Sequence, residues 1–350
     1  MKRQLRILSA IDIPWNSGLA AYAFAQAEAL RARGHFVVFA CPPGTAAWDY
    51  AARAGFKAVP VPGRKEHHKL PLALLRLRAA AAADGIDVVA AHTGRLQTLS
   101  CLLGLRTVRV KADAKLPTAG FTFSSVAGVV AASSYIAGLY AAAGLDPARV
   151  TVIRQGIELP RVLPREPRAP YRVGLLGRLD LVKGHSVFLR AAAELLRAGV
   201  PASFHVAGYE ANLKYHDLRA EAADLGIGEH VYFHGRTEGP YAFMGSCDLG
   251  VIASLGSEAV SRAALEWLAA GKPLVAASVG SLPEYVEKER LVPPGDPAAL
   301  AAAVGALLRS PHLLPELGAA NREKAARAFS PAAFAEATER FFLEAAAGRP

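Results

Sequence analysis

Short runs of apolar, β-branched residues alternate along this chain with longer runs rich in Ala and Leu. The apolar runs predict strands, because a strand that is covered on both faces has a nearly continuous apolar sequence. In the first half of the chain the predicted strands are Arg6–Ile11, Val37–Ala40, Asp87–His92, Thr107–Lys111, Gly128–Ser133 and Val150–Ile153. In the second half they are Tyr171–Gly177, Ser203–Gly208, Val231–Gly235, Leu249–Ser254 and Pro273–Ser278.

The segments between these strands predict helices. In Leu19–Arg33 the apolar residues recur at steps of three and four, and Gly34 follows directly. Ser186–Arg197 shows the same spacing and is followed closely by Gly199. Both patterns are typical of amphipathic helices that end at a glycine. Strands alternating with helices predict an α/β fold with doubly wound parallel sheets.

A proline-rich segment divides the chain near its middle. Residues 158–170 contain four prolines and several charged residues, which predicts a linker. A chain of 350 residues is long enough for two domains, which we place at 1–157 and 171–330. We expect the two Rossmann-like domains to face a central cleft, because strand and helix ends of both sheets would line a ligand site there.

Composition favours a globular protein in a reducing compartment. Hydrophobic residues make up 52% of the chain and charged residues 20%. The three cysteines are far apart, which argues against a disulfide framework and a structural zinc site. The N-terminus leads into a strand without a secretory h-region, so we expect no signal peptide and a cytoplasmic protein.

Leu116–Leu145 has no charged residue and is long enough to cross a bilayer. Two interpretations are open: a membrane span, or a strand, a turn and a helix. The Ala-, Gly- and Ser-rich sequence favours the second.

The net charge of +10 favours anionic partners. The basic segment 64–78 has two interpretations: a surface that docks on anionic lipid at the inner face of the cytoplasmic membrane, or a solvated loop that leads into a helix. Aromatic residues do not alternate with these cations, so we expect no nucleic-acid partner.

The segment GRLDLVKG, Gly177–Gly184, follows a predicted strand and precedes a predicted helix. Its glycines permit close backbone approach, and Arg178 and Lys183 add two cations where a helix N-terminus already favours anions. A pyrophosphate matches this charge. A basic loop without a ligand is the alternative interpretation.

The segment Ser257–Pro273 carries two glutamates, Glu258 and Glu266. If both lie on or near one helix, they are about 12 Å apart, which is too far to act together on one bond but suits two sugar rings of one nucleotide sugar. Two solvated glutamates are the alternative. Arg262 lies four residues from each and could pair with either, or meet an anionic group of an acceptor.

Three familiar motifs are missing. Gly271-Lys272-Pro273 lacks the flanking residues of a P-loop, no GxGxxG begins the first helix of either domain, and no two aspartates are two residues apart. The sequence therefore has neither the dinucleotide-binding fingerprint nor an Asp-x-Asp metal site.

These features together resemble the retaining GT-B glycosyltransferases of family 4 (glycosyl transferases group 1), over nearly the whole chain. The resemblance rests on Gly177–Gly184 and Glu258–Glu266, and on His35, Val150–Leu159, Val231–Arg236 and Pro331–Ala346. It implies a donor-binding C-terminal domain, an acceptor-side N-terminal domain, and a last helix, 331–346, that packs back on the N-terminal domain.

The resemblance also implies roles for individual residues. Arg178 and Lys183 would bind the donor diphosphate beside Gly177 and stabilise the departing nucleotide. Glu266 would hold the ribose. Glu258, with backbone amides of Ser257, Ala259 and Val260, would position the donor sugar.

Three further positions follow from the same resemblance. Arg236 would lie near the base, Gly18 would border the cleft, and His92 would approach the reacting sugar. Two departures concern the loop at Gly18, where the family often has two adjacent glycines, and the Ala-Val-Ser after Glu258, where it often has Gly-Phe-Gly. The second departure resembles bacterial surface-polysaccharide and lipopolysaccharide transferases and leaves the donor sugar open.

We therefore expect a metal-independent transferase that moves a sugar from a UDP-, GDP- or ADP-linked donor to a glycan or lipid-linked acceptor, in assembly of the bacterial cell envelope. Leaving-group stabilisation by the two cations is its expected main catalytic contribution. Two alternatives remain: a nucleotide-sugar epimerase with a similar architecture, and a non-catalytic protein that binds anions or nucleic acid.

Overall fold

The computed structural model describes residues 3–15, 17–118, 120, 122–161, 165–256 and 258–348, without the side chain of His67. The chain forms two compact units. Unit 1 comprises Met1–Gly156 and Pro331–Pro350, and unit 2 comprises Ile157–Ser330. The segment 158–170, which the sequence predicts as a linker, is grouped with unit 2.

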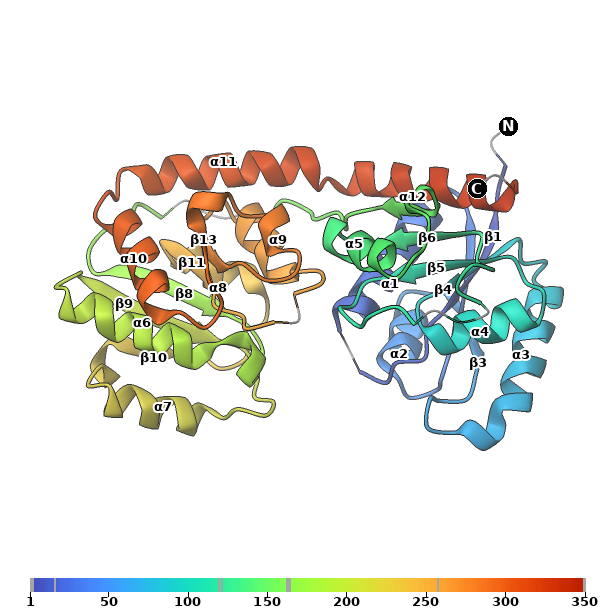
Figure 1. Cartoon of the computed structure of the whole chain (residues 1–350), viewed down its shortest axis with the longest axis horizontal. Coiled ribbons are helices and arrows are strands. Elements are labelled where there is room, and N and C mark those ends of the chain that lie inside the picture. The colour runs from blue at the N-terminus through green and yellow to red at the C-terminus, as the bar shows by residue number, and fades with distance from the viewer. Residues whose placement is uncertain are drawn as a thin grey trace. The chain divides into compact units, whose positions relative to one another are not determined.

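Unit 1 contains a parallel sheet of seven strands in the order β3-β2-β1-β4-β5-β6-β7 (Figure 1). Its strands are β1 Arg6–Ala10, β2 Phe36–Cys41, β3 Lys57–Pro60, β4 Val88–Ala91, β5 Thr107–Lys111, β6 Gly128–Ala131 and β7 Val150–Val152. All but β3 were predicted. β3 escaped prediction because it is short, begins with a lysine, ends with a proline and lies at the sheet edge, where prolines are tolerated.

The helices of unit 1 pack on this sheet. They are α1 Gly18–Ala32, α2 Ala46–Arg53, α3 Leu70–Ala83, α4 Gly94–Leu102, α5 Ser134–Ala142 and α12 Pro331–Ala346, with short 3-10 turns η1 His67–Lys69 and η2 Pro147–Arg149. Leu77 of α3 and Leu96 of α4 are fully buried in one core cluster with strand residues. Helix α12 packs on α1, where Arg33 donates a 2.7 Å hydrogen bond to Glu339 and the Tyr22 ring meets Phe334 edge-on.

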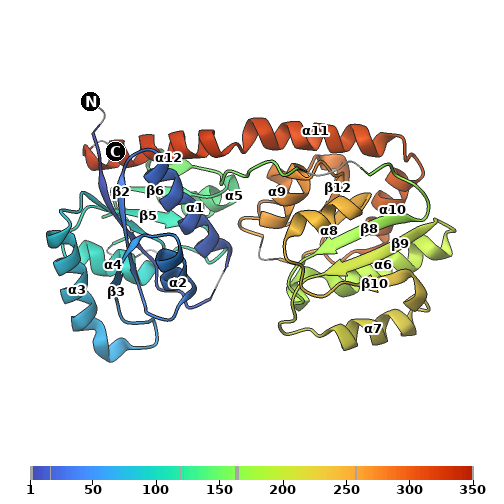
Figure 2. The ribbon, with the colours of Figure 1, turned by 180° about the vertical axis from the view of Figure 1, so that it is seen from behind.

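Unit 2 contains a parallel sheet of six strands in the order β10-β9-β8-β11-β12-β13 (Figure 2). Its strands are β8 Tyr171–Leu176, β9 Ala202–Ala207, β10 Val231–Phe233, β11 Leu249–Ile252, β12 Leu274–Ala277 and β13 Leu291–Val292. The two-residue β13 was not predicted, because a run so short has no period to detect. The remaining strands were, and two parallel α/β sheets confirm the predicted fold class.

The helices of unit 2 are α6 His185–Arg197, α7 Tyr215–Asp224, α8 Pro240–Ser246, α9 Arg262–Ala269, α10 Pro297–Leu308 and α11 Leu313–Ala328. Short 3-10 turns are η3 Leu181–Lys183, η4 Gly228–His230, η5 Leu282–Glu284 and η6 Lys288–Arg290. The fully buried Trp267 anchors α9 against the sheet. Glycines at 174 and 250 make room for its ring, since a Cβ at Gly250 would lie 2.5 Å from it.

Each sheet has one point at which the strand order reverses. In unit 1 this topological switch point lies between β1 and β4, and in unit 2 between β8 and β11. In open parallel sheets, ligands bind outside the carboxyl ends of the strands at such points. The loops that follow β1, β4, β8 and β11 are therefore where functional side chains are expected.

The uncharged segment Leu116–Leu145 contains β6, a turn and α5, which is the strand–turn–helix interpretation. Within the described residues, no single helix combines the length and apolar composition of a membrane span. Among the same described residues, one pair of helices, Pro297–Leu308 and Leu313–Ala346 with a bend of 106° between them, reaches that length and composition jointly.

Candidate active site

The loop after β8 is pressed against the neighbouring strand end. It ends at Gly184, which has a φ of 70° and which a larger residue could replace only if the backbone shifted, because a Cβ there would lie 1.9 Å from the carbonyl oxygen of Ala253. A Cβ at Gly208, after β9, would similarly lie 1.8 Å from the Gly177 oxygen. Glycine at 184 and 208 thus allows the Gly177–Gly184 loop to lie at the switch point of unit 2.

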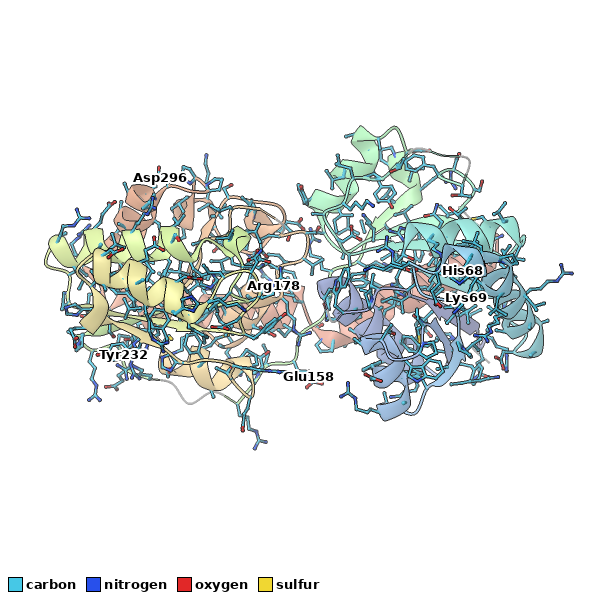
Figure 3. The ribbon with its side chains drawn as sticks, turned by 90° about the horizontal axis from the view of Figure 1, so that it is seen from below. His68, Lys69, Glu158, Arg178, Tyr232 and Asp296 are labelled. Carbon is cyan, nitrogen blue, oxygen red and sulfur yellow. The ribbon has the colours of Figure 1, made fainter. Side chains whose placement is uncertain are left out.

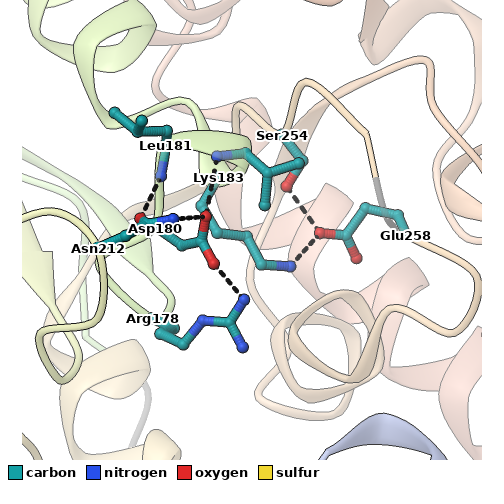
Figure 4. Close-up of polar contacts among 8 residues, drawn as sticks. Arg178, Asp180, Leu181, Lys183, Asn212, Ser254 and Glu258 are labelled. Carbon is teal, nitrogen blue, oxygen red and sulfur yellow. Dashed lines mark hydrogen bonds and ion pairs between the residues drawn. The ribbon is translucent and has the colours of Figure 1, made fainter.

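Lys183 and Glu258 meet at this switch point (Figure 4). The Lys183 ammonium donates a 2.6 Å hydrogen bond to Glu258 Oε1, and Ser254 Oγ donates a 2.7 Å hydrogen bond to the same oxygen. The Glu258 side chain is 5% exposed and that of Lys183 26%. The other carboxylate oxygen, Oε2, accepts no hydrogen bond within the described part of the chain, so it is available to a ligand hydroxyl.

Arg178 belongs to a second network in the same loop (Figure 4). Its guanidinium pairs with Asp180, whose other oxygen accepts hydrogen bonds from the Val182 backbone amide at 3.3 Å and from Asn212 at 3.1 Å. Asn212 in turn accepts from the Leu181 amide at 3.1 Å. Asp180 therefore caps η3 and holds the loop that carries both cations.

Charge pairing keeps the cation Arg178 and the anion Asp180 ionised. Burial opposes the charge on each, but their mutual hydrogen bond and attraction outweigh it, so the pKa of Arg178 is raised and that of Asp180 is lowered. Because guanidinium and ammonium groups bind phosphate oxygens strongly, the loop is equipped to hold a pyrophosphate.

Glu258 lies in the loop after β11, and α9 begins only at Arg262. Glu258 therefore precedes the helix that contains Glu266, and the separation expected for two residues of one helix does not apply to them. The Glu258 carbonyl accepts hydrogen bonds from the backbone amide and the hydroxyl of Ser281, at 2.7 and 2.9 Å. A Cβ at Gly280 would lie 2.3 Å from that carbonyl oxygen. These contacts hold the main chain of Glu258, and the hydrogen bonds from Lys183 and Ser254 hold its side chain.

Glu266 has a different partner. It lies in α9, is 8% exposed, and accepts a 2.8 Å hydrogen bond from Arg262 Nε. Of the two carboxylates with which Arg262 could pair, Glu266 is its partner in the structure. Burial raises the pKa of Glu266, against the opposing charge of Arg262. The charge of Glu266 acts on Tyr241, whose pKa is raised to about 12 chiefly by burial.

The remaining predicted donor-site residues of unit 2 are less closely tied to this network. Arg236 follows the edge strand β10, is exposed, and has no hydrogen bond or ion pair with any residue that the structure describes. Tyr232 of the same strand lies well away from Arg178 in unit 2 (Figure 3). Ala259 is buried and Val260 half-buried, and Ser257 lies outside the described residues.

Two predicted residues belong to unit 1. Gly18 begins α1, after Ser17, whose hydroxyl accepts from the Ala20 amide at 3.3 Å. His92 follows β4, is fully buried, and has Nε2 3.1 Å from Ser9 Oγ. Burial, and then the nearby charge of Arg109, lower the pKa of His92 to about 3, so it is neutral. The site roles of Gly18 and His92 stay predictions.

Sequence reasoning missed three residues that organise the site: Asp180, Asn212 and Ser254. Asp180 lies inside the segment Gly177–Gly184, but the local sequence does not indicate that its side chain caps η3. Ser254 is the last residue of a predicted strand, and strand-end hydroxyls at a switch point could have been flagged. Asn212 had no local signal, because it lies 31 residues from its partner Leu181.

Within the described residues, no group of three or more His, Cys, Asp or Glu side chains is arranged to hold a metal ion. Metal independence stays a prediction.

Two family models match the chain. The one described as Glycosyltransferase Family 4 matches residues 16–161, and the one described as Glycosyl transferases group 1 matches residues 170–310.

Curated relatives carry related names. The chain is 34% identical to an MMP alpha-(1->4)-mannosyltransferase of Mycolicibacterium hassiacum and to D-inositol 3-phosphate glycosyltransferase 2 of Catenulispora acidiphila, each over 53% of this chain. It spans about half the length of these relatives, 46% and 48%. It is 29% identical to a phosphatidyl-myo-inositol mannosyltransferase of Mycobacterium leprae over 90% of both chains.

Solved structures share the fold at low identity. Anabaena HepE in complex with UDP-glucose has a TM-score of 0.79 at 17% identity, over 97% of this chain and 100% of that chain. The lipopolysaccharide outer core galactosyltransferase WaaB has a TM-score of 0.77 at 14% identity, over 98% and 99%. The family matches and the two parallel sheets together show that this chain belongs to the glycosyltransferases of family 4 (glycosyl transferases group 1) and has the GT-B fold.

Proposed function

We propose that this protein transfers a sugar from a nucleoside-diphosphate sugar to a hydroxyl of a glycan or lipid-linked acceptor. The observation that carries this proposal is the pairing of Lys183 with Glu258 at the switch point of unit 2, beside Arg178. The loops after β8 and β11 thus bring two cations and a carboxylate together. The cations suit a diphosphate, and the carboxylate suits the hydroxyls of the attached sugar.

The cations act on the leaving group. As the bond between the anomeric carbon and the phosphate oxygen breaks, its electron pair stays on the nucleoside diphosphate. Arg178 and Lys183 stabilise that developing negative charge, and they are held in place before the reaction by Asp180 and Glu258. The acceptor hydroxyl forms the new bond to carbon, and its proton leaves with the diphosphate.

The carboxylates position the donor. Glu258 Oε2 accepts from hydroxyls of the transferred sugar, while Glu266 accepts from the ribose. Donor binding exchanges the Lys183–Glu258 contact, at least in part, for contacts of each side chain with the ligand. The fixed direction of Glu258 makes the donor sugar's orientation reproducible.

The finer features of the proposal rest on the family. Retention of anomeric configuration, metal independence and a role in the cell envelope follow from the resemblance. WaaB, whose name states a lipopolysaccharide acceptor, is one structural neighbour. We place the protein in the cytoplasm, at the inner face of the membrane. Exposed His68 and Lys69 in unit 1 (Figure 3), with Arg64 and Arg78, supply a basic surface that supports this location.

Ligand-induced thermal stabilisation tests the donor proposal. UDP, GDP, ADP and their glucose, mannose and galactose derivatives are added to the purified protein, with and without EDTA. One nucleotide diphosphate is expected to raise Tm in a saturable way, unchanged by EDTA, because the site supplies its own cations. The corresponding monophosphate, with less negative charge, is the matched control and should bind more weakly.

No shift with any nucleotide diphosphate would overturn the proposal. Exchange of isotope at the donor sugar without an acceptor would favour an epimerase. Salt-sensitive oligonucleotide binding, unaffected by nucleotides, would favour a nucleic-acid-binding protein.

A further inference from the structure

The loop that follows β9 lies against the Gly177–Gly184 loop, and we call its residues 208–213 the β9 loop. The Leu179 amide donates a 2.8 Å hydrogen bond to the Tyr209 carbonyl, and the Leu179 carbonyl accepts one from the Ala211 amide at 3.0 Å. An isolated parallel bridge at the same place continues the pairing of β8 with β9 beyond the ends of both strands. The two loops are therefore held together by their main chains.

Asn212 of the β9 loop is joined to Arg178 through Asp180 (Figure 4). Its Nδ2 donates a 3.1 Å hydrogen bond to Asp180 Oδ1, and its Oδ1 accepts one from the Leu181 amide at 3.1 Å. Asp180 Oδ2, the other carboxylate oxygen, pairs with the Arg178 guanidinium. Asn212 is exposed, so its amide could bond to water instead, and the fold does not need these contacts to satisfy a buried group.

Tyr209 contacts the same guanidinium directly. A Cβ at Gly208 would lie 1.8 Å from the Gly177 oxygen, so the two loops approach closely at these glycines. Each glycine is followed by one of the two side chains, which makes Tyr209 and Arg178 neighbours. Burial lowers the pKa of Arg178, but Asp180 and then a hydrogen bond to the Tyr209 hydroxyl raise it overall. Tyr209 is 50% exposed, so water is an alternative partner for this hydroxyl as well.

The Arg178 guanidinium needs such support because its side chain is long and flexible. This side chain is 42% exposed, and fixing it in one rotamer costs conformational entropy. If Arg178 is fixed before the bond to the leaving group breaks, the reaction does not bear this cost. The β9 loop holds Arg178 in two ways, through Asp180 and through the Tyr209 hydroxyl.

We propose that the β9 loop positions Arg178 for leaving-group stabilisation, through Asn212, which holds Asp180, and through Tyr209, which contacts the guanidinium. Asn212 and Tyr209 are thus positioning residues, because they act on the departing diphosphate only through Arg178. The inference rests on the proposed function, in which Arg178 stabilises that diphosphate.

Hydrolysis of a nucleotide sugar, with water in place of the acceptor, tests this positioning role. UDP-glucose, GDP-mannose and ADP-glucose are offered, and kcat and KM are measured with the one that is turned over fastest. Asn212→Ala should lower kcat about tenfold and Tyr209→Phe about threefold, with KM nearly unchanged, because a misplaced guanidinium matters most when charge develops. Tm shows whether each variant folds, and Tyr209→Phe, which keeps its ring, serves if Asn212→Ala does not.

A double-mutant cycle with Arg178→Ala distinguishes positioning from a general effect on the fold. If Asn212 and Tyr209 act through Arg178, their substitutions should change kcat by less than about twofold when Arg178 is already replaced. A general loss of folded protein, or a direct contact with the donor, would instead lower kcat by the same factor in both backgrounds.

Tyr232→Phe is the matched control for Tyr209→Phe. Tyr232 is 49% exposed, like Tyr209, and belongs to unit 2, but it lies in β10, well away from Arg178 (Figure 3). Loss of its hydroxyl should leave kcat at the wild-type value.

Two results would overturn the inference: wild-type kcat in the folded variants, or equal losses with and without Arg178. If the wild type binds UDP, GDP or ADP but hydrolysis is too slow to measure, the same cycle is run on the affinity for that nucleotide. Asn212→Ala should then weaken binding about threefold only when Arg178 is present. A wild type that neither binds these nucleotides nor hydrolyses their sugars refutes the proposed function instead.

Discussion

At the scale of single residues, the two cations of the Gly177–Gly184 loop are held by acids from two different sources. Asp180 belongs to the same loop as Arg178, whereas Glu258 reaches Lys183 from 75 residues further along the chain. Each acid offsets the repulsion between cations that share one loop. Under the proposed function, a diphosphate would replace these carboxylate contacts and find both cations already in place.

Replacing Lys183 or Arg178 by Ala is expected to lower donor turnover by about two to three orders of magnitude, because each removes a preplaced charge from the leaving group. Donor turnover is measured as the initial rate with the nucleotide sugar that the thermal-shift experiment identifies.

The control for charge is Lys288→Ala, at an exposed position in η6. It should keep wild-type turnover. Normal turnover in both the Lys183 and Arg178 variants would remove the pyrophosphate assignment.

Gly184 carries a second prediction at this scale. Gly184→Ala should lower the free energy of unfolding of unit 2 by more than about 2 kcal/mol, because a left-handed backbone costs about 1–2 kcal/mol for a residue with a Cβ and the added methyl also meets the Ala253 carbonyl. Urea unfolding and UDP titration measure the stability and the loss of donor affinity.

Gly199→Ala separates the two causes. Gly199 has nearly the same φ, 72°, but a Cβ there has nothing within 4 Å. It should cost only the backbone strain and leave UDP affinity intact. Equal costs for the two variants would show that the close approach to Ala253 is unimportant.

At the scale of secondary-structure elements, the switch points decide which loops matter. In unit 2 the loops after β8 and β11 carry Arg178, Lys183 and Glu258, and in unit 1 the loops after β1 and β4 carry Asp12 and His92. Helix α9 is held near the first of these sites by the packing of Trp267 over the glycines of β8 and β11.

Gly250→Ala should destabilise unit 2 by about 1–3 kcal/mol, because its methyl group would lie 2.5 Å from the buried Trp267 ring and the ring must shift. Since Glu266 neighbours Trp267 in α9, the shift should also weaken donor binding. Urea unfolding followed by Trp fluorescence measures the first effect, and UDP titration the second.

Gly228→Ala is the matched control, because a Cβ at that position meets nothing within 4 Å and the backbone there is not in the left-handed region that favours glycine. It should change the unfolding free energy by less than about 0.5 kcal/mol. A Gly250 variant as stable as this control would mean that the Trp267 packing is loose.

At the scale of the whole molecule, buried neutral histidines make stability depend on pH. Burial lowers the pKa of His92 to about 3, and lowers those of His185 and His205 to about 4. In the unfolded chain these groups titrate near 6.5. Below pH 6.5 the unfolded chain therefore binds more protons than the folded one, and stability falls as the pH drops toward 4.

Between pH 7.5 and 4, the unfolding free energy of unit 2 should fall by roughly 2–3 kcal/mol less in His205→Gln than in the wild type, because the side chain at position 205 no longer titrates. Urea midpoints at several pH values measure this difference between variant and wild type. The exposed His216→Gln is the control and should follow the wild-type curve. A wild-type protein that gains stability on acidification across this range would contradict the assignment.

The sequence by itself determined the succession of strands and helices, because the apolar period is local. It also determined that Arg178 and Lys183 share a glycine-flanked loop after a strand, since glycine, charge and strand end are neighbours in the chain. The edge strands β3 and β13 stayed hidden, because too few residues carry their pattern.

Only the tertiary structure decided the partners. Lys183 meets Glu258, Arg262 selects Glu266, and Asn212 binds the η3 turn because strand order and helix packing bring distant segments together. The fold also decided that Arg109 and Lys111 are buried, although charged residues are mostly exposed. Contacts of this kind depend on which strands become neighbours, and no local pattern of residue types encodes that.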